Sequence, residues 1–120
     1  MGKIDDLNAL GIITSDGLDY TGGDEDFYYE MLQDYVDVRD ERVSELKKLY
    51  DEAAWPDYRT GVHSLKSVSR MLGITSIAEP AYELEKASDA GDEAYIRAHH
   101  DETLKAYEDM VENIKTIIAG

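Results

Sequence analysis

The chain has 120 residues, of which 42% are hydrophobic and 32% charged, a composition typical of one soluble globular domain, which we expect to span residues 1–120. Its 27 acidic residues against 12 basic ones give a formal net charge of −15, which argues against nucleic acids and anionic membrane surfaces as partners. The sequence has no cysteine, no apolar signal core at the N-terminus and no apolar run near the ~20 residues that span a bilayer. We therefore expect a cytoplasmic protein that does not insert into membranes.

The first half of the chain predicts helices, because apolar residues recur at helical spacing and no stretch alternates with period two. A short amphipathic helix over residues 4–10 is followed by a Gly-rich connector over residues 11–24. Asp24 then caps a long helix that we expect to reach about Glu52. The polar run DVRDER around Arg39 interrupts the apolar stripe of this helix and marks a point where it can bend.

The second half predicts three further helices. The first opens at the Ala-Ala-Trp-Pro-Asp run and ends at about Leu72, where Gly73 is a natural left-handed C-cap. The next begins at Thr75 or Ser76 and ends in the SDAGD turn, and the last begins at about Asp92. The predicted fold class is all-α, an antiparallel four-helix bundle with a short extra N-terminal helix.

The segment over residues 58–78 contains no Asp or Glu, although the chain as a whole is strongly acidic. Arg59, Lys66 and Arg70 all fall within this segment. Such a gap in an acidic chain suggests that a negatively charged group binds there.

His63 lies on the outer face of the predicted helix, opposite the apolar stripe that faces the core. Lys66 and Ser67 follow at i+3 and i+4, and Arg59 and Arg70 lie on the same side. Because helical side chains lean towards the N-terminus, Lys66 can bring its ammonium towards the imidazole, and Ser67 is small enough to leave the ring open. An imidazole nitrogen can accept a phosphoryl group, whose charge these cations can stabilise. The alternative is an ordinary solvent-facing histidine, and spacing alone does not decide between the two.

The stretch H-S-L-K-S-x5-G resembles the signature of histidine-containing phosphotransfer (HPt) domains, H-x-L-K-G-x5-G. The pattern A-x2-LE-x-A and a Gly-Asp turn follow in AYELEKASDAGD, and the upstream DGLDYTGGDEDFY is similar to the N-terminal part of the family, so the resemblance covers roughly residues 4–105. It implies a four-helix phosphocarrier of a bacterial two-component phosphorelay, with His63 as phospho-acceptor, Lys66 near the phosphoryl group and Gly73 at the turn after the helix. Ser67 departs from the glycine that is usual in the family.

The resemblance also implies the partners. These are receiver domains of response regulators, whose aspartates exchange the phosphoryl group, and a sensor histidine kinase. We expect no cofactor on the chain itself, because Mg²⁺ belongs to the partner receiver. We expect a monomer whose docking patch around the histidine includes Ser64, Ser67 and Met71, with Arg59 and Arg70 as further binding residues.

Sequence motifs of other chemistry are missing. The chain has no P-loop, no kinase glycine-rich loop and no Ser/His/Asp constellation, so we expect a carrier and not an enzyme with its own ATP site. His99 and His100 lie about 100° apart on a helix, and no HExxH or EF-hand loop occurs, so we expect no metal site. His100 continues the apolar stripe of the last helix, which favours a partly buried, hydrogen-bonded role.

Two other classes of function stay open. One is an adaptor bundle that docks on receiver domains or other signalling proteins without carrying phosphate. Loss of phosphorylation with retained binding would identify it. The other is an acidic mimic of nucleic acid, which only the net charge suggests and the basic segment argues against.

Overall fold

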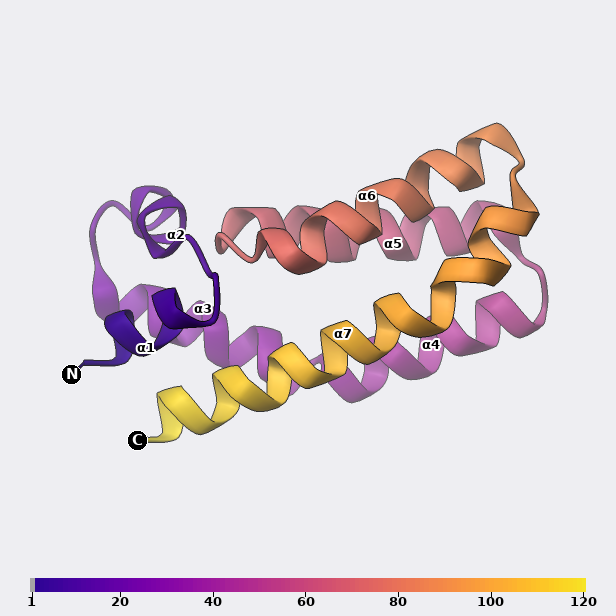
Figure 1. Cartoon of the computed structure of the whole chain (residues 1–120). Coiled ribbons are helices and arrows are strands. Elements are labelled where there is room, and N and C mark those ends of the chain that lie inside the picture. Colours follow the sequence, from indigo (N-terminus) through magenta and orange to yellow (C-terminus); the bar gives the residue numbers. More distant parts are fainter. Residues whose placement is uncertain (1) are drawn as a thin grey trace.

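The computed structural model describes residues 2–120, and within this range every regular element is a helix (Figure 1). The all-α class is confirmed, while the predicted domain start at Met1 lies outside the described residues. None of the helices in this range is long and apolar enough to span a membrane. In chain order the helices are α1 Lys3–Ala9, α2 Thr14–Tyr20, α3 Glu25–Asp37, α4 Arg39–Asp51, α5 Trp55–Met71, α6 Thr75–Ala90 and α7 Glu93–Ala119.

The Gly-rich segment after α1 is the clearest difference from the sequence prediction. The prediction has one short N-terminal helix and a connector, but the connector itself contains α2. The Thr14 hydroxyl at the start of α2 donates a hydrogen bond to Oδ1 of Asn8 (2.8 Å). Gly17 lies so close to Tyr28 that a Cβ would be 2.1 Å from a ring carbon. This glycine therefore allows a close helix–helix contact and does not mark a loop.

The predicted long helix is present as two helices, α3 and α4, separated by Val38 alone. Val38 has φ −87° and ψ −2°, and the backbone hydrogen bonds continue across it, from Val38 to Asp34 and from Arg42 to Val38. The chain thus bends without leaving a near-helical path, one residue from the position that the polar run indicates. At the other end, Asp24 accepts a hydrogen bond from the Phe27 amide (3.1 Å), as expected of an N-cap.

Helix α5 lies between α4 and α6 and packs most extensively along α6 (Figure 1). The long helix α7 packs against α6, α3 and α4 and also contacts α1. The apolar stripes of these helices meet in one core, which contains four tyrosines that are at most 1% exposed, namely Tyr28, Tyr35, Tyr58 and Tyr107. The molecule is elongated, with extents of 44 × 22 × 20 Å.

Gly73 follows α5 in a left-handed conformation, with φ +80°. A Cβ at this position would lie 2.0 Å from the carbonyl oxygen of Ile13. The same pair is joined by a backbone hydrogen bond from the Ile13 amide to the Gly73 carbonyl (2.9 Å). The turn between α5 and α6 thus holds the segment between α1 and α2 in place.

Candidate functional site

His63 lies in the middle of α5, with 46% of its side chain exposed. Its Nδ1 atom lies 2.9 Å from Oε2 of Glu85 on α6, a carboxylate whose side chain is only 8% exposed. Because an ionised carboxylate can only accept hydrogen bonds, we infer that Nδ1 carries the hydrogen. In the neutral ring the Nε2 atom is then the one with a free lone pair.

Glu85 gathers the basic side chains around His63. Nζ of Lys66 lies 2.7 Å from Oε1 of Glu85, and Nη2 of Arg59 lies 3.0 Å from Oε2. Arg59 is anchored at a second point by Oδ1 of Asp89, 3.0 Å from its Nε atom. Burial disfavours the charged carboxylate and raises the pKa of Glu85, but the interactions with Lys66 and His63 outweigh burial and leave this pKa below its usual range. Glu85 is therefore an anion at neutral pH.

The position of Lys66 differs in detail from the sequence interpretation. The sequence suggests that its ammonium points at the imidazole, whereas in the structure Lys66 and His63 converge on the same carboxylate. The Lys66 side chain is only 12% exposed, so the ion pair fixes it against α6. Lys66 and His63 thus interact with each other through Glu85, which both side chains bind.

Sequence reasoning gave no role to Glu85, although it is the LE acid of the A-x2-LE-x-A pattern. The position of Glu85 on its helix could have indicated its role. Glu85 continues the stripe of buried residues on α6 that also contains Ala78 and Ala81. An acid on a buried stripe needs a cationic partner, and the acid-free segment of α5 supplies one.

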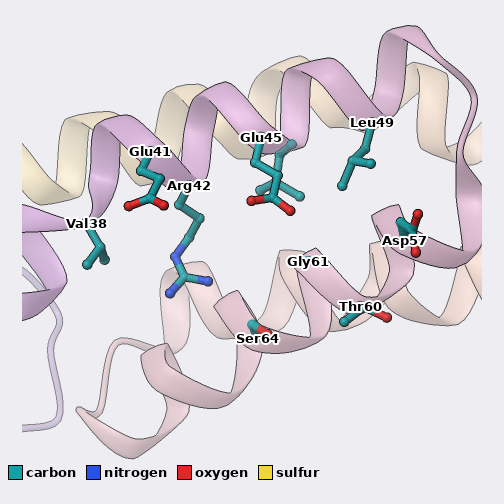
Figure 2. A pocket seen from close by; sticks show the side chains of 10 residues that line it. Val38, Glu41, Arg42, Glu45, Leu49, Asp57, Thr60, Gly61 and Ser64 are labelled. Atoms are coloured by element: carbon teal, nitrogen blue, oxygen red, sulfur yellow. The ribbon is translucent and has the colours of Figure 1, made fainter.

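The remaining predicted residues take different positions along α5. Arg70 is exposed, and its guanidinium carbon lies 5.7 Å from the centre of the Tyr82 ring on α6. Ser67 and Met71 are partly buried, which for Ser67 is less exposure than the sequence suggests. Ser64 is exposed and faces away from α6 towards α4 (Figure 2).

A groove of about 440 Å³ lies between α4 and α5 on the side of Ser64 (Figure 2). In Figure 2 the side chains of Glu41, Arg42 and Glu45 point from α4 into the gap, and Asp57 lies at the end of it where α5 begins. The groove and the Glu85 cluster therefore flank α5 on opposite sides. The lining residues are Val38, Glu41, Arg42, Glu45, Leu46, Leu49, Asp57, Thr60, Gly61 and Ser64.

The other two histidines have different environments from His63. His100 is 2% exposed, stacks on Tyr50 at a centroid distance of 3.9 Å, and has its Nδ1 atom 2.7 Å from the Tyr58 hydroxyl. The hydrogen bond agrees with the role that the sequence favours, and the burial is deeper than the partly buried position expected from the sequence. His99 contacts Glu102 one turn further along α7. Among residues 2–120 no group of three or more His, Asp or Glu side chains is arranged to hold a metal ion.

The family model of the Hpt domain matches residues 30–117, well over half of the chain, and the chain therefore belongs to this family. Members of the family are phosphocarriers that act in phosphorelays together with receiver domains and kinases. The match includes α5 and α6, which carry the His63–Glu85 pair, and leaves out α1 and α2. Searches of curated proteins and of solved structures gave no match.

Proposed function

We propose that the chain is a phosphocarrier which accepts a phosphoryl group on Nε2 of His63 and exchanges it with the aspartate of a receiver domain. The observation that carries the proposal is the hydrogen bond between Nδ1 and the buried Glu85 carboxylate, on a ring that is otherwise half exposed. The bond leaves Nε2 as the nucleophile and fixes the plane of the ring.

The transfer needs only positioning and charge stabilisation from this chain. When Nε2 attacks an aspartyl phosphate, the N–P bond forms, the P–O bond breaks and the aspartate leaves as a carboxylate. The ring gains positive charge while its proton stays on Nδ1, where the Glu85 carboxylate stabilises it. The reverse transfer uses the same contacts.

The residues around the ring have separate roles in this proposal. A phosphoryl group adds a charge of about −1.5 to −2 at neutral pH, which Lys66 and Arg59 stabilise from the α6 side. Ser67, one turn after the histidine, leaves room for the receiver to approach. Ser64, Arg70 and Met71 belong to the docking face around the ring in this proposal.

The wider expectations belong to the same proposal. The bent α3–α4 pair, α5, α6 and α7 form the antiparallel four-helix bundle of the carrier. The chain works as a monomer in the cytoplasm and needs no cofactor of its own, since the receiver binds Mg²⁺ and a sensor histidine kinase supplies the ATP chemistry.

The direct test is His63→Gln, assayed with a phosphorylated receiver domain from the same genome. We expect the variant to keep its helical content and its affinity for the receiver but to take up no phosphoryl group. Uptake at the level of the parent chain would show that another residue is the acceptor. A parent chain that binds the receiver without taking up phosphate would identify an adaptor instead.

A further inference from the structure

Tyr82 on α6 is a large aromatic side chain at the surface, with 39% of the residue exposed. Three cations surround its ring. Nζ of Lys86 lies 4.9 Å, Nζ of Lys66 5.4 Å and the guanidinium carbon of Arg70 5.7 Å from the ring centre. Cations near the face of an aromatic ring are attracted to it, so these contacts hold the tyrosine in place at the surface. We refer to Tyr82, Lys66, Arg70 and Lys86 as the α6 patch.

The α6 patch is positive on a strongly negative protein. Lys66 is paired with Glu85, and Lys86 with Glu83 at 3.3 Å. Arg70 forms no ion pair within 4.0 Å among residues 2–120. Three cations against two carboxylates leave a charge of +1, whereas the whole chain carries −15.

The patch adjoins the candidate phosphotransfer site, because Lys66 contacts both the Tyr82 ring and the carboxylate that holds His63. At 100° per residue, Lys66 and Arg70 lie about 60° and 20° from His63 on one side of α5, and Ser64 about 100° on the other. Ser64 borders the groove lined by Glu41, Glu45, Asp57 and Arg42, whose formal charges add to −2 (Figure 2). The sign of the local charge therefore changes across the helix that carries the histidine.

We propose that the α6 patch is a docking surface for a cluster of carboxylates on the partner, and that Tyr82 is its aromatic anchor. The proposal rests on the proposed function, and the partner is the receiver domain, with acidic residues around its phospho-accepting aspartate. Charge complementarity favours this occupant, because a second copy of a chain with a net charge of −15 is repelled at long range. Exposed tyrosines and arginines are the residue types that most often dominate binding energy at interfaces.

Complementary charge on one flank of His63 and like charge on the other would fix the orientation of the receiver. Such complementarity acts mainly on the association rate and on the choice of partner, and salt screens it. Tyr82 should slow dissociation, since its ring makes contact with the receiver only after the two proteins have docked.

The test compares four patch variants and one control variant with the parent chain, using a receiver that exchanges phosphate with the parent. Arg70→Glu and Lys86→Glu should each slow association about tenfold at low salt, and the difference should vanish near 1 M salt. Tyr82→Ala should speed dissociation about tenfold, whereas Tyr82→Phe should bind like the parent. Lys115→Glu on α7 changes the net charge by the same amount at an exposed site without a patch contact, and serves as the matched control.

The outcomes separate this proposal from the proposed function. If the parent transfers phosphate but Arg70→Glu and Lys86→Glu associate at the rate of the Lys115→Glu control, the docking proposal is wrong and the phosphocarrier proposal stands. If these variants bind normally but transfer slowly at saturating receiver, the patch acts on chemistry and the docking proposal is also wrong. A parent chain that neither binds nor exchanges phosphate with any receiver from the same genome would overturn both proposals.

Discussion

At the scale of single residues, the Glu85 carboxylate controls how His63 presents its ring. Glu85→Ala removes the acceptor for the Nδ1 hydrogen, so we expect transfer to slow by roughly 10- to 100-fold, the range known for carboxylates that orient metal-binding histidines. Glu85→Gln keeps an oxygen acceptor and should lie between the parent and the alanine variant. Single-turnover transfer rates at saturating receiver concentration will show whether the parent is fastest, Glu85→Gln intermediate and Glu85→Ala slowest.

The same substitution has a structural cost that must be measured beside the rate. Glu85→Ala leaves the largely buried Lys66 without its carboxylate, so we expect a loss of about 1–3 kcal/mol in the free energy of unfolding. Denaturant unfolding separates this loss from the kinetic effect. If the alanine variant transfers phosphate as fast as the parent, Glu85 does not position His63.

Ser67 gives a second prediction at this scale. A side chain at i+4 leans over the turn of His63, so its bulk should affect access to the ring more than stability. Ser67→Gly should preserve or improve transfer at a cost of about 0.5 kcal/mol in helix stability. Ser67→Leu should keep the fold and transfer more slowly. Equal transfer by the leucine variant and the parent would contradict the view that the small residue keeps the ring accessible.

The sequence pattern could place His63 and Lys66 on one face of a helix, because helical spacing is a local property. It could not show that both side chains meet Glu85, which is 22 residues from His63 in the chain and reaches it only through the packing of α5 against α6. For the same reason no local pattern could indicate that three cations lie around the ring of Tyr82.

At the scale of elements, the turn between α5 and α6 depends on Gly73. Any side chain there meets both an unfavourable left-handed backbone and the Ile13 carbonyl. We expect Gly73→Ala to cost roughly 2–4 kcal/mol, well above the penalty for the backbone conformation alone. Gly91 provides a matched control, because its φ is +69° and a Cβ there would meet nothing within 4 Å. Gly91→Ala should cost only about 1 kcal/mol.

Denaturant unfolding of the two glycine variants measures this difference. Equal losses would mean that the contact between the α5–α6 turn and the N-terminal segment contributes nothing to stability. The phosphate uptake of Gly73→Ala should return to the parent level at temperatures where the variant is folded, since the glycine does not contact His63.

The elements differ in how far the sequence determined them. The ends of α5 and α6 follow from local signals, such as the glycines at 73 and 91, both of which have positive φ. The α2 helix could not be predicted from local signals. Glycine has a low helix propensity, so Gly17 suggests a loop, but in the structure it allows a close contact between α2 and Tyr28. The break between α3 and α4 lies near the predicted bend, yet only the structure shows that a single residue separates them.

At the scale of the whole molecule, the buried His100 should make stability depend on pH. Burial lowers the pKa of His100, while Asp101 and Asp51 act in the opposite direction and Lys47 acts with burial. The Tyr58 hydroxyl, whose own pKa is raised by burial, lies 2.7 Å from Nδ1. A neutral Nδ1 without a hydrogen accepts from this hydroxyl, whereas in the protonated ring Nδ1 can only donate to it. The folded state therefore favours the neutral ring.

The sign of the effect follows from linkage. Because the folded pKa lies below the unfolded value of 6.5, the unfolded chain binds a proton first, and stability falls as the pH drops below about 6.5 towards the folded pKa. Glu85 adds to the loss at lower pH, since its lowered pKa gives stability that disappears as the pH falls through the folded value. Thermal melts across pH 4.5–8 should show the decline caused by His100, and the loss caused by Glu85 should begin only below about pH 4.5.

Two histidine variants isolate the contribution of His100. His100→Gln keeps an acceptor for Tyr58 but does not titrate, so its stability should vary less between pH 7 and 5.5 than that of the parent. His99→Gln changes the neighbouring exposed histidine and should keep the parent's dependence. If both variants decline with the parent's slope, His100 is not the group responsible.

The central claim concerns one atom, Nε2 of His63, and nitrogen–phosphorus correlation by NMR tests it most directly. The chain is labelled with ¹⁵N-histidine, phosphorylated by its receiver or kinase, and examined for scalar coupling between ³¹P and the ring nitrogens. The account predicts one coupled nitrogen, Nε2 of His63, with the hydrogen retained on Nδ1 and no coupling in His63→Gln. Coupling to Nδ1, coupling to His99 or His100, or a phosphorylated protein without any nitrogen–phosphorus coupling would contradict it.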